Sequence, residues 1–125
     1  MTTIPTLLSE PAAEEGSYFI TVSFLDEDDN AETPNADTIY WTLTDRYANV
    51  INERDYEAET SATSITIELE GDDLALQASE AGSDVVRRYV TVLWEYDSDL
   101  GNNKPGKAEC VFPLHRVKRI PVAVV

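Results

Sequence analysis

The chain has 125 residues, and its 24 Asp and Glu side chains against 9 Lys and Arg give a formal net charge of −15 at pH 7. A negative charge of this size opposes binding to nucleic acid or to anionic lipid through the body of the protein. With 42% hydrophobic residues, the composition lies well above the disordered range and fits one globular domain.

The cysteine count and the hydropathy pattern exclude further classes of protein. Cys110 is the only cysteine, so an intrachain disulfide is excluded, and its place on an apolar strand face indicates buried packing. No stretch approaches the roughly 20 apolar residues of a membrane span, and the N-terminus lacks the basic and apolar regions of a signal peptide. We therefore expect a protein made in the cytoplasm and not exported, with no membrane partner and no nucleic-acid partner.

The charge is unevenly distributed along the chain. Residues 104–125 carry a net charge of +4, whereas the remaining 103 residues carry −19. Because a basic end can dock on an acidic body, this split favours head-to-tail contact between copies or contact with a differently charged partner. We expect a homo-oligomer or a multi-copy protein in an assembly.

Alternation of apolar and polar residues with a period of two predicts an all-β fold. The strongest pattern is a hairpin over residues 85–114, whose arms place Trp94, Cys110 and Phe112 on inward faces and whose turn formers span residues 97–106. Six to seven strands at this spacing indicate an antiparallel β-sandwich. The other strands are predicted at residues 18–25, 38–44, 50–54 and 63–70, with residues 55–62 either an edge strand or an irregular crossover.

Three local features are also predicted. The connection after residue 44 has no glycine, so Asn49 is expected to take a left-handed backbone conformation. Residues 71–76 suggest a helical turn capped by Asp72. Trp41 and Trp94 fall on apolar strand faces and are expected to face each other across the two sheets.

Residues 1–16 do not fit the pattern of the domain. The segment holds two prolines and small residues, and Ile4, Leu7 and Leu8 supply its sizeable apolar side chains. It is either a tail without a core of its own or an N-terminal arm that lays these side chains on a neighbouring subunit. We favour the arm, which places the globular domain at residues 17–115.

Residues 116–125 form a second distinct segment, with the sequence RVKRIPVAVV. It is either the last edge strand of the same sandwich or a C-terminal arm that adds a strand to another subunit. An unpaired apolar strand is sticky, so we expect a protein surface to cover it. The residues of this segment expected to bind a partner are the basic Arg116, Lys118 and Arg119 and the apolar Ile120, Val122 and Val124.

The sequence contains no constellation typical of catalysis. His115 is the only histidine and stands at a strand end, where surface exposure is expected. There is no G-x-S-x-G elbow, no glycine-clustered phosphate loop and no Cys/His spacing of a metal site. We predict a protein that is not an enzyme and has no cofactor.

Two acidic loops are weak candidates for a calcium site. Asp26 and Asp28 follow one predicted strand, and Asp97 and Asp99 follow another. Loops of this kind can share one end of a sandwich, and oxygen-rich loops bind hard cations such as calcium. Neither loop matches an EF-hand.

Four segments carry a resemblance to a known family. Their sequences are YFITVSFLDEDD (18–29), TIYWTLTDRYANVI (38–51), ITIELEGDDL (65–74) and RRYVTVLWEYDSD (87–99). Together, over residues 18–114, they resemble the small immunoglobulin-like structural proteins encoded in tailed-bacteriophage morphogenesis modules, although the hairpin lacks the turn glycine that such sequences often have. The resemblance implies an immunoglobulin-like β-sandwich and a virion component without catalysis.

We therefore expect a bacteriophage virion structural protein, made in the host cytoplasm, whose arms contact other virion proteins. Decoration or stabilisation of the capsid, by contact with the major capsid protein, is the first expectation. A head–tail connector or tail accessory protein is the alternative. A rival from another class is a carbohydrate or host-surface binding module, which would use the acid-rich loops and the tyrosines expected to be exposed, namely Tyr40, Tyr47, Tyr56 and Tyr89.

Overall fold

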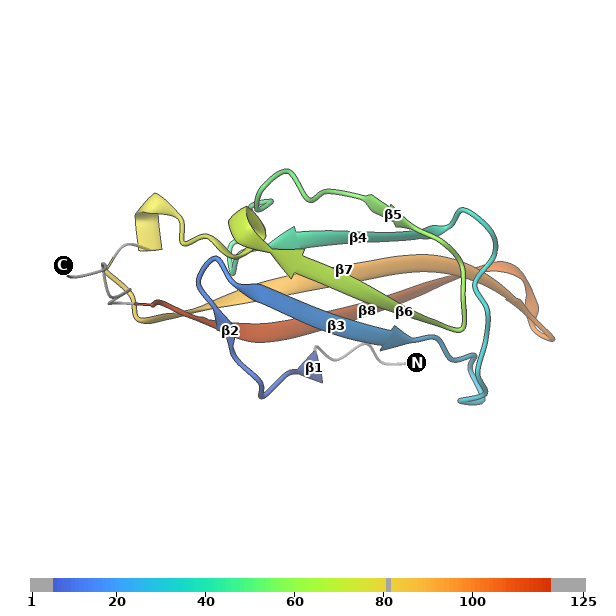
Figure 1. Ribbon diagram of the computed structural model, residues 1–125. Coiled ribbons are helices and arrows are strands. Elements are labelled where there is room, and N and C mark those ends of the chain that lie inside the picture. The colour runs from blue at the N-terminus through green and yellow to red at the C-terminus, as the bar shows by residue number, and fades with distance from the viewer. Residues whose placement is uncertain (1–5, 81, 118–125) are drawn as a thin grey trace.

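The computed structural model describes residues 6–80 and 82–117, and within them the chain is built from β-strands and two short 3₁₀ turns (Figure 1). No helix among these residues is long and apolar enough to cross a membrane. The strands are β1 (Thr6–Leu7), β2 (Ala12–Ala13), β3 (Ser17–Ser23), β4 (Ile39–Thr44), β5 (Glu57–Glu59), β6 (Ser64–Glu70), β7 (Val85–Ser98) and β8 (Gly101–His115), and the 3₁₀ turns are η1 (Gly71–Leu74) and η2 (Ala78–Glu80).

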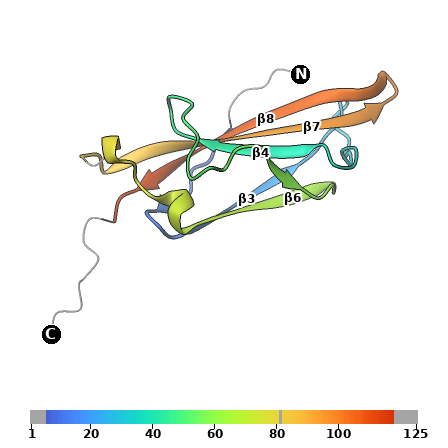
Figure 2. The same ribbon diagram turned by 90° about the horizontal axis from the view of Figure 1, so that it is seen from above.

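The strands form two sheets that pack face to face as a sandwich. The larger sheet has the order β1–β8–β7–β4–β5, with β2 also paired to β8, and the smaller sheet consists of β3 and β6. Figure 2 shows β3 and β6 in one layer and β4, β7 and β8 in the other. In chain order, β3, β4, β6, β7 and β8 take the places of strands B, C, E, F and G of an immunoglobulin domain, and β5 takes that of C′. The predicted immunoglobulin-like β-sandwich is confirmed, with the two short strands β1 and β2 in addition.

Every second side chain of β3, β4 and β6, and of residues 88–94 in β7, is buried, as the period of two predicts. Two aromatic contacts join the layers: Tyr18 stacks on Phe112 at 4.5 Å between ring centroids, and Phe24 meets Trp94 edge-on at 4.8 Å. Each large apolar side chain buried in this way stabilises the fold by about 1.5–3 kcal/mol. The buried residues of the small sheet are Tyr18, Ile20, Val22, Ile65, Ile67 and Leu69, and those of the large sheet include Ile39, Trp41, Leu43, Val90, Val92, Trp94, Phe112 and Leu114.

The predicted pairing of the two tryptophans across the sheets is wrong. Trp41 lies on β4 and is registered with Val92 of β7, so Trp41 and Trp94 occupy neighbouring strands of the same sheet. Both are buried, but Trp94 packs on Phe24, and the indole nitrogen of Trp41 donates to Glu59 at 3.0 Å. Inward residues of adjacent strands lie side by side and therefore cannot face each other.

The predicted ten-residue turn of the long hairpin is also wrong, because only Asp99 and Leu100 separate β7 from β8. The Asp97 carboxylate accepts the Asn103 N–H at 2.8 Å across this turn. Gly106 lies within β8 opposite Trp94, where a Cβ atom would collide with the indole ring. The glycine is thus required by packing rather than by a turn, and the hairpin continues past the ends of β3 and β6 (Figures 1 and 2).

Two predictions about the segment after β4 need correction. Residues 50–54 do not form a strand, because only a single bridge joins Thr44 to Val50, and Asn52 and Glu53 have φ of 51° and 57°. The left-handed residue of the preceding turn is Ala48, with φ of 66°, rather than Asn49. The ambiguous stretch at 55–62 contains the short edge strand β5.

The residue that organises η1 is Asp73, not the predicted cap Asp72. The N-cap is Glu70, whose N–H donates to the Asp73 carboxylate at 3.2 Å. Asp73 is fully buried and also accepts the Asn52 amide at 2.8 Å and the Arg54 guanidinium at 2.8 and 3.1 Å. Burial by itself raises the pKa of Asp73, but these hydrogen bonds outweigh it and hold the pKa below its ordinary value of 3.8.

Asp73→Asn should lower the free energy of unfolding at neutral pH by roughly 2 kcal/mol, because the charged hydrogen bonds to Arg54 are lost. Since the folded-state pKa of Asp73 is depressed, this stabilisation is complete above about pH 4 and is lost as the pH falls through the folded value. Urea unfolding along a pH series measures both effects. Asp72→Asn, at an exposed position of the same turn, is the control, and an equal loss in that variant would contradict the assignment.

Candidate functional site

Strand β3 is hydrogen-bonded on one side only. The bonds Gly71 N–H to Gly16 O and Phe24 N–H to Thr63 O, both 3.0 Å, flank its ladder with β6. Because bonded and non-bonded pairs alternate in an antiparallel ladder, the residues between them at even positions bond to β6. The backbone N–H and C=O groups of Phe19 and Thr21 therefore point to the opposite edge, where no other strand of the described chain pairs with β3.

The two open edges of the small sheet differ in chemistry. An unpaired edge is a template for a further strand, and proteins commonly protect such an edge with charged side chains. The outward residues of β6 include Glu68 and Glu70, whereas those of β3 are uncharged and include Phe19, which is 62% exposed. The β3 edge is therefore the less protected of the two.

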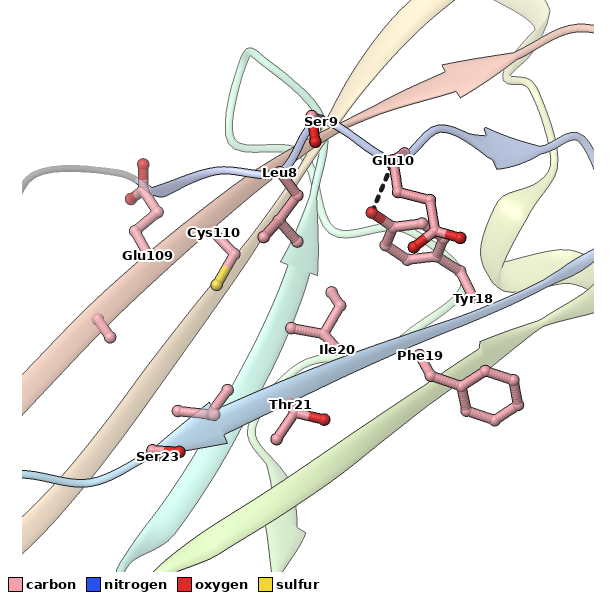
Figure 3. Close-up of a pocket in the computed structure, with 12 residues that line it drawn as sticks. Leu8, Ser9, Glu10, Tyr18, Phe19, Ile20, Thr21, Ser23, Glu109 and Cys110 are labelled. Carbon is pink, nitrogen blue, oxygen red and sulfur yellow. Dashed lines mark hydrogen bonds between the residues drawn. The ribbon is translucent and has the colours of Figure 1, made fainter. Parts of the chain in front are cut away.

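A groove of about 440 Å³ runs beside β3. Its walls are β3 itself and the N-terminal segment with Leu8, Ser9 and Glu10, and Ala108 to Cys110 of β8 complete its lining. Figure 3 shows the Leu8 side chain extending from the N-terminal segment toward Ile20 on β3. An added strand at the β3 edge would thus find main-chain partners on one side and apolar side chains beneath it.

The N-terminal wall of the groove is fixed to the protein's own sandwich. Strands β1 and β2 run parallel to β8, and the Leu8 N–H donates to the Val111 carbonyl at 2.8 Å. The Tyr18 hydroxyl donates to the Glu10 carbonyl at 2.6 Å and closes the segment onto β3 (Figure 3). From Thr6 onward, the predicted arm is therefore packed on its own domain.

The predicted partner-binding residues fall into three groups. Leu8 is half-buried and packs against its own core, whereas Leu7 is 64% exposed. Arg116 lies where the chain leaves β8, and its N–H donates to the Asp84 carbonyl at 2.8 Å. Contact of these three residues with a partner stays a prediction. The remaining candidates lie outside the described residues: Ile4, Lys118, Arg119, Ile120, Val122 and Val124.

Two ionisable groups of the groove, the Tyr18 hydroxyl and the Cys110 thiol, have raised pKa values. Burial, followed by the nearby Glu10 and Cys110, raises the pKa of Tyr18. Burial, followed by Glu109, raises the pKa of the Cys110 thiol. A thiol with a raised pKa is a poor nucleophile, so the groove offers backbone and apolar contacts rather than reactive groups.

The two acidic loops do meet at one end of the sandwich, where the Ser98 hydroxyl donates to Glu27 at 2.7 Å and lowers the pKa of that carboxyl. The Asp26 carboxylate accepts hydrogen bonds from its own loop, and the Asp97 carboxylate accepts from its own turn and from the Asn35 amide. The other two calcium candidates, Asp28 and Asp99, are exposed. Within residues 6–80 and 82–117, no group of three or more acidic, His or Cys side chains is placed to hold a metal ion.

The predicted exposure of the tyrosines holds for only two of the four. Tyr47 and Tyr56 are 71% and 62% exposed, whereas Tyr40 and Tyr89 are half-buried.

The sequence did not predict the free edge of β3. The signal for it was Phe19, an aromatic residue at a position where the alternation predicts a polar one.

Comparison with known proteins gives no assignment. No protein-family model matches the chain, and no curated protein matches it. A solved chain from a study of multimeric cell-adhesive interactions of VGSC beta subunits is 12% identical, covers 95% of this chain and 98% of its own length, and has a TM-score of 0.41. This similarity is too low to support an inference about fold or function.

Tyr18→Phe should loosen the N-terminal wall of the groove, because the hydrogen bond to the Glu10 carbonyl is lost. A loss of about 1 kcal/mol in the local opening free energy corresponds to roughly fivefold faster amide exchange. Hydrogen–deuterium exchange at the Leu8 amide measures it. Tyr47→Phe, on an exposed side chain, is the control, and unchanged exchange in Tyr18→Phe would contradict the role of this hydroxyl.

Proposed function

We propose that this protein is a non-enzymatic structural component that joins an assembly by receiving a β-strand at the free edge of β3. The observation that carries the proposal is that no described strand pairs with the outward backbone groups of Phe19 and Thr21, which lie beside a groove lined in part by Leu8 and Ala108. In strand addition, main-chain hydrogen bonds supply affinity and side-chain pockets supply specificity. Both features lie along the same side of β3.

The strength of such a contact follows from its size. Phe19 and Thr21 offer four backbone groups, and each hydrogen bond contributes about 0.5–1.5 kcal/mol net. The sum of about 2–6 kcal/mol, before the cost of ordering the incoming strand, corresponds to weak binding by one copy. A protein that uses this contact therefore works in many copies, where multivalency multiplies the affinity.

We propose a tailed-bacteriophage virion as the setting. The resemblance of residues 18–114 to phage immunoglobulin-like structural proteins supports this, and a net charge of −15 suits docking on a basic protein surface. Capsid decoration or stabilisation, on the major capsid protein, is the role we favour, with a head–tail connector or tail accessory role as the alternative. The protein would be made in the host cytoplasm and reside in the virion.

The non-enzymatic part of the proposal is supported by the state of the chain's single histidine and single cysteine, which are residue types common in catalysis. His115 is exposed at the end of β8. Cys110 lines the groove, and the raised pKa of its thiol disfavours the reactive thiolate. Neither residue is poised as a base or a nucleophile.

Thr21→Pro should reduce incorporation of the protein into particles at least tenfold, because it removes one N–H from the β3 edge. That N–H does not bond to β6, so the fold should persist. Thr66→Pro is the matched control, since Thr66 is registered opposite Thr21 and its N–H points to the other edge of the same sheet. Quantitative mass spectrometry of purified particles gives the copy number of each form.

Equal incorporation of the two variants would contradict strand addition at β3. Absence of the wild-type chain from particles would contradict the virion setting. Glycan binding by the isolated protein that survives Thr21→Pro would favour the carbohydrate-binding or host-surface module instead.

A further inference from the structure

We infer that the strand received at β3 is the segment 120–125 of a second copy of this chain, added antiparallel to β3. The inference rests on the proposed function of the β3 edge and names its occupant. The contact is an interface between copies in which one copy donates its C-terminal segment and the other accepts it.

The chemistry of the segment matches that of the groove. Residues 120–125 read IPVAVV and contain no charge, and their β-branched side chains suit a strand. In an extended strand, Ile120, Val122 and Val124 share one face. That face is complementary to the apolar part of the groove's lining, Leu8 and Ala108, which lies beside the polar Ser9, Glu10 and Glu109.

The position of Pro121 is consistent with one antiparallel register. With Ala123 opposite Thr21 and Val125 opposite Phe19, the free backbone groups of β3 find partners on both residues. Pro121 then falls opposite Ser23, the last residue of β3, so the missing N–H lies at the end of the added ladder, where it is tolerated. The same register directs Val122 and Val124 to the groove side.

The distribution of charge also supports an antiparallel orientation of residues 120–125 on β3. In this register Lys118 and Arg119 lie beyond Ser23, where the chain continues into the acidic loop Asp26-Glu27-Asp28-Asp29. The pKa of Glu27 is lowered by the hydrogen bond from Ser98, so that carboxylate stays ionised at neutral pH. The basic residues that precede the apolar segment thus meet the acidic loop that follows β3.

The point at which the chain leaves its own sandwich indicates that residues 120–125 bind the β3 edge of a second copy and not their own. The Val117 N–H donates to the Glu14 carboxylate at 3.1 Å, two residues before Gly16, so the chain departs at the Ser17 end of β3. Ile120 follows only three residues later and reaches at most about 11 Å from Val117, whereas β3 is about 20 Å long. Its own segment could therefore only run parallel to β3, while antiparallel addition, the somewhat stronger pairing, enters from the Ser23 end.

The test separates donor and acceptor by complementation. The donor variant is Thr21→Pro, whose edge is blocked, and the acceptor variant is the full chain with Val122→Asp and Val124→Asp. By sedimentation velocity, the wild type and Thr66→Pro should self-associate with concentration, and each of the two variants alone should sediment as a monomer. Mixed in equal amounts at a concentration at which the wild type self-associates, the two variants should form a 1:1 dimer and nothing larger, because only one donor and one acceptor remain.

The outcomes distinguish the inference from the proposed function. Self-association of the acceptor variant equal to that of the wild type, or a mixture that stays monomeric, overturns the assignment of residues 120–125. If incorporation of Thr21→Pro into particles is still reduced, the β3 edge remains the binding site, but for a different strand. If Thr21→Pro is incorporated into particles as well as Thr66→Pro is, the proposed function is wrong as well.

A fluorescent peptide of residues 117–125 supplies a second measurement. It should bind the acceptor variant and bind Thr21→Pro at least tenfold more weakly. A wild-type chain that stays monomeric and rejects a peptide that the acceptor variant binds would show that the segment pairs within its own chain, which overturns the second copy. Thermal unfolding of all variants confirms that they are folded.

Discussion

Backbone N–H and C=O groups need hydrogen-bond partners, and the rest of this structure depends on that constraint. A sheet of two strands satisfies the groups on one side of each strand only, so within residues 6–80 and 82–117 both β3 and β6 keep an open edge. On β6, Glu68 and Glu70 give that edge a charge that repels an incoming strand. On β3 the outward residues are uncharged and a groove lies alongside. The asymmetry between the two edges, more than any single side chain, makes β3 the less protected edge of the small sheet.

The open edge is tolerable because the small sheet is anchored elsewhere. Arg54 and Asp73 join the segment after β4 to the turn after β6 through two hydrogen bonds. Arg88 on β7 is fully buried, and its guanidinium donates to Glu80 at 2.8 and 2.7 Å and to the Ala75 carbonyl at 3.2 Å. A buried charge without its partner is strongly destabilising, so this pair fixes the connection between β6 and β7 in one conformation. The edge of β3 can thus stay unpaired without loosening the sandwich.

The sequence predicts the strands well where one face is buried, and poorly where a side chain replaces a backbone partner. Alternation locates β3, β6 and both arms of the hairpin, because their inward residues enter one core. It does not reveal that Asp73, rather than Asp72, caps η1, since that depends on Arg54, which is 19 residues away in the chain. Gly106 reads as a turn residue until Trp94 is seen to lie against it. The pairing of the N-terminal segment with β8 is equally hidden, because two-residue strands carry no period.

A symmetric alternative, in which two β3 edges pair with each other, is disfavoured by charge. It would bring together two bodies that each carry −19 over residues 1–103, with Asp26 to Asp29 of each copy near Glu14 and Glu15 of its partner. Screening acts over about 8 Å at physiological ionic strength, so charges this close still repel. A segment preceded by Lys118 and Arg119 instead brings opposite charges together at the contact, although each copy carries a net charge of −15. Added salt should therefore strengthen β3-to-β3 pairing more than addition of the C-terminal segment, and the size of the salt effect on self-association separates the two arrangements.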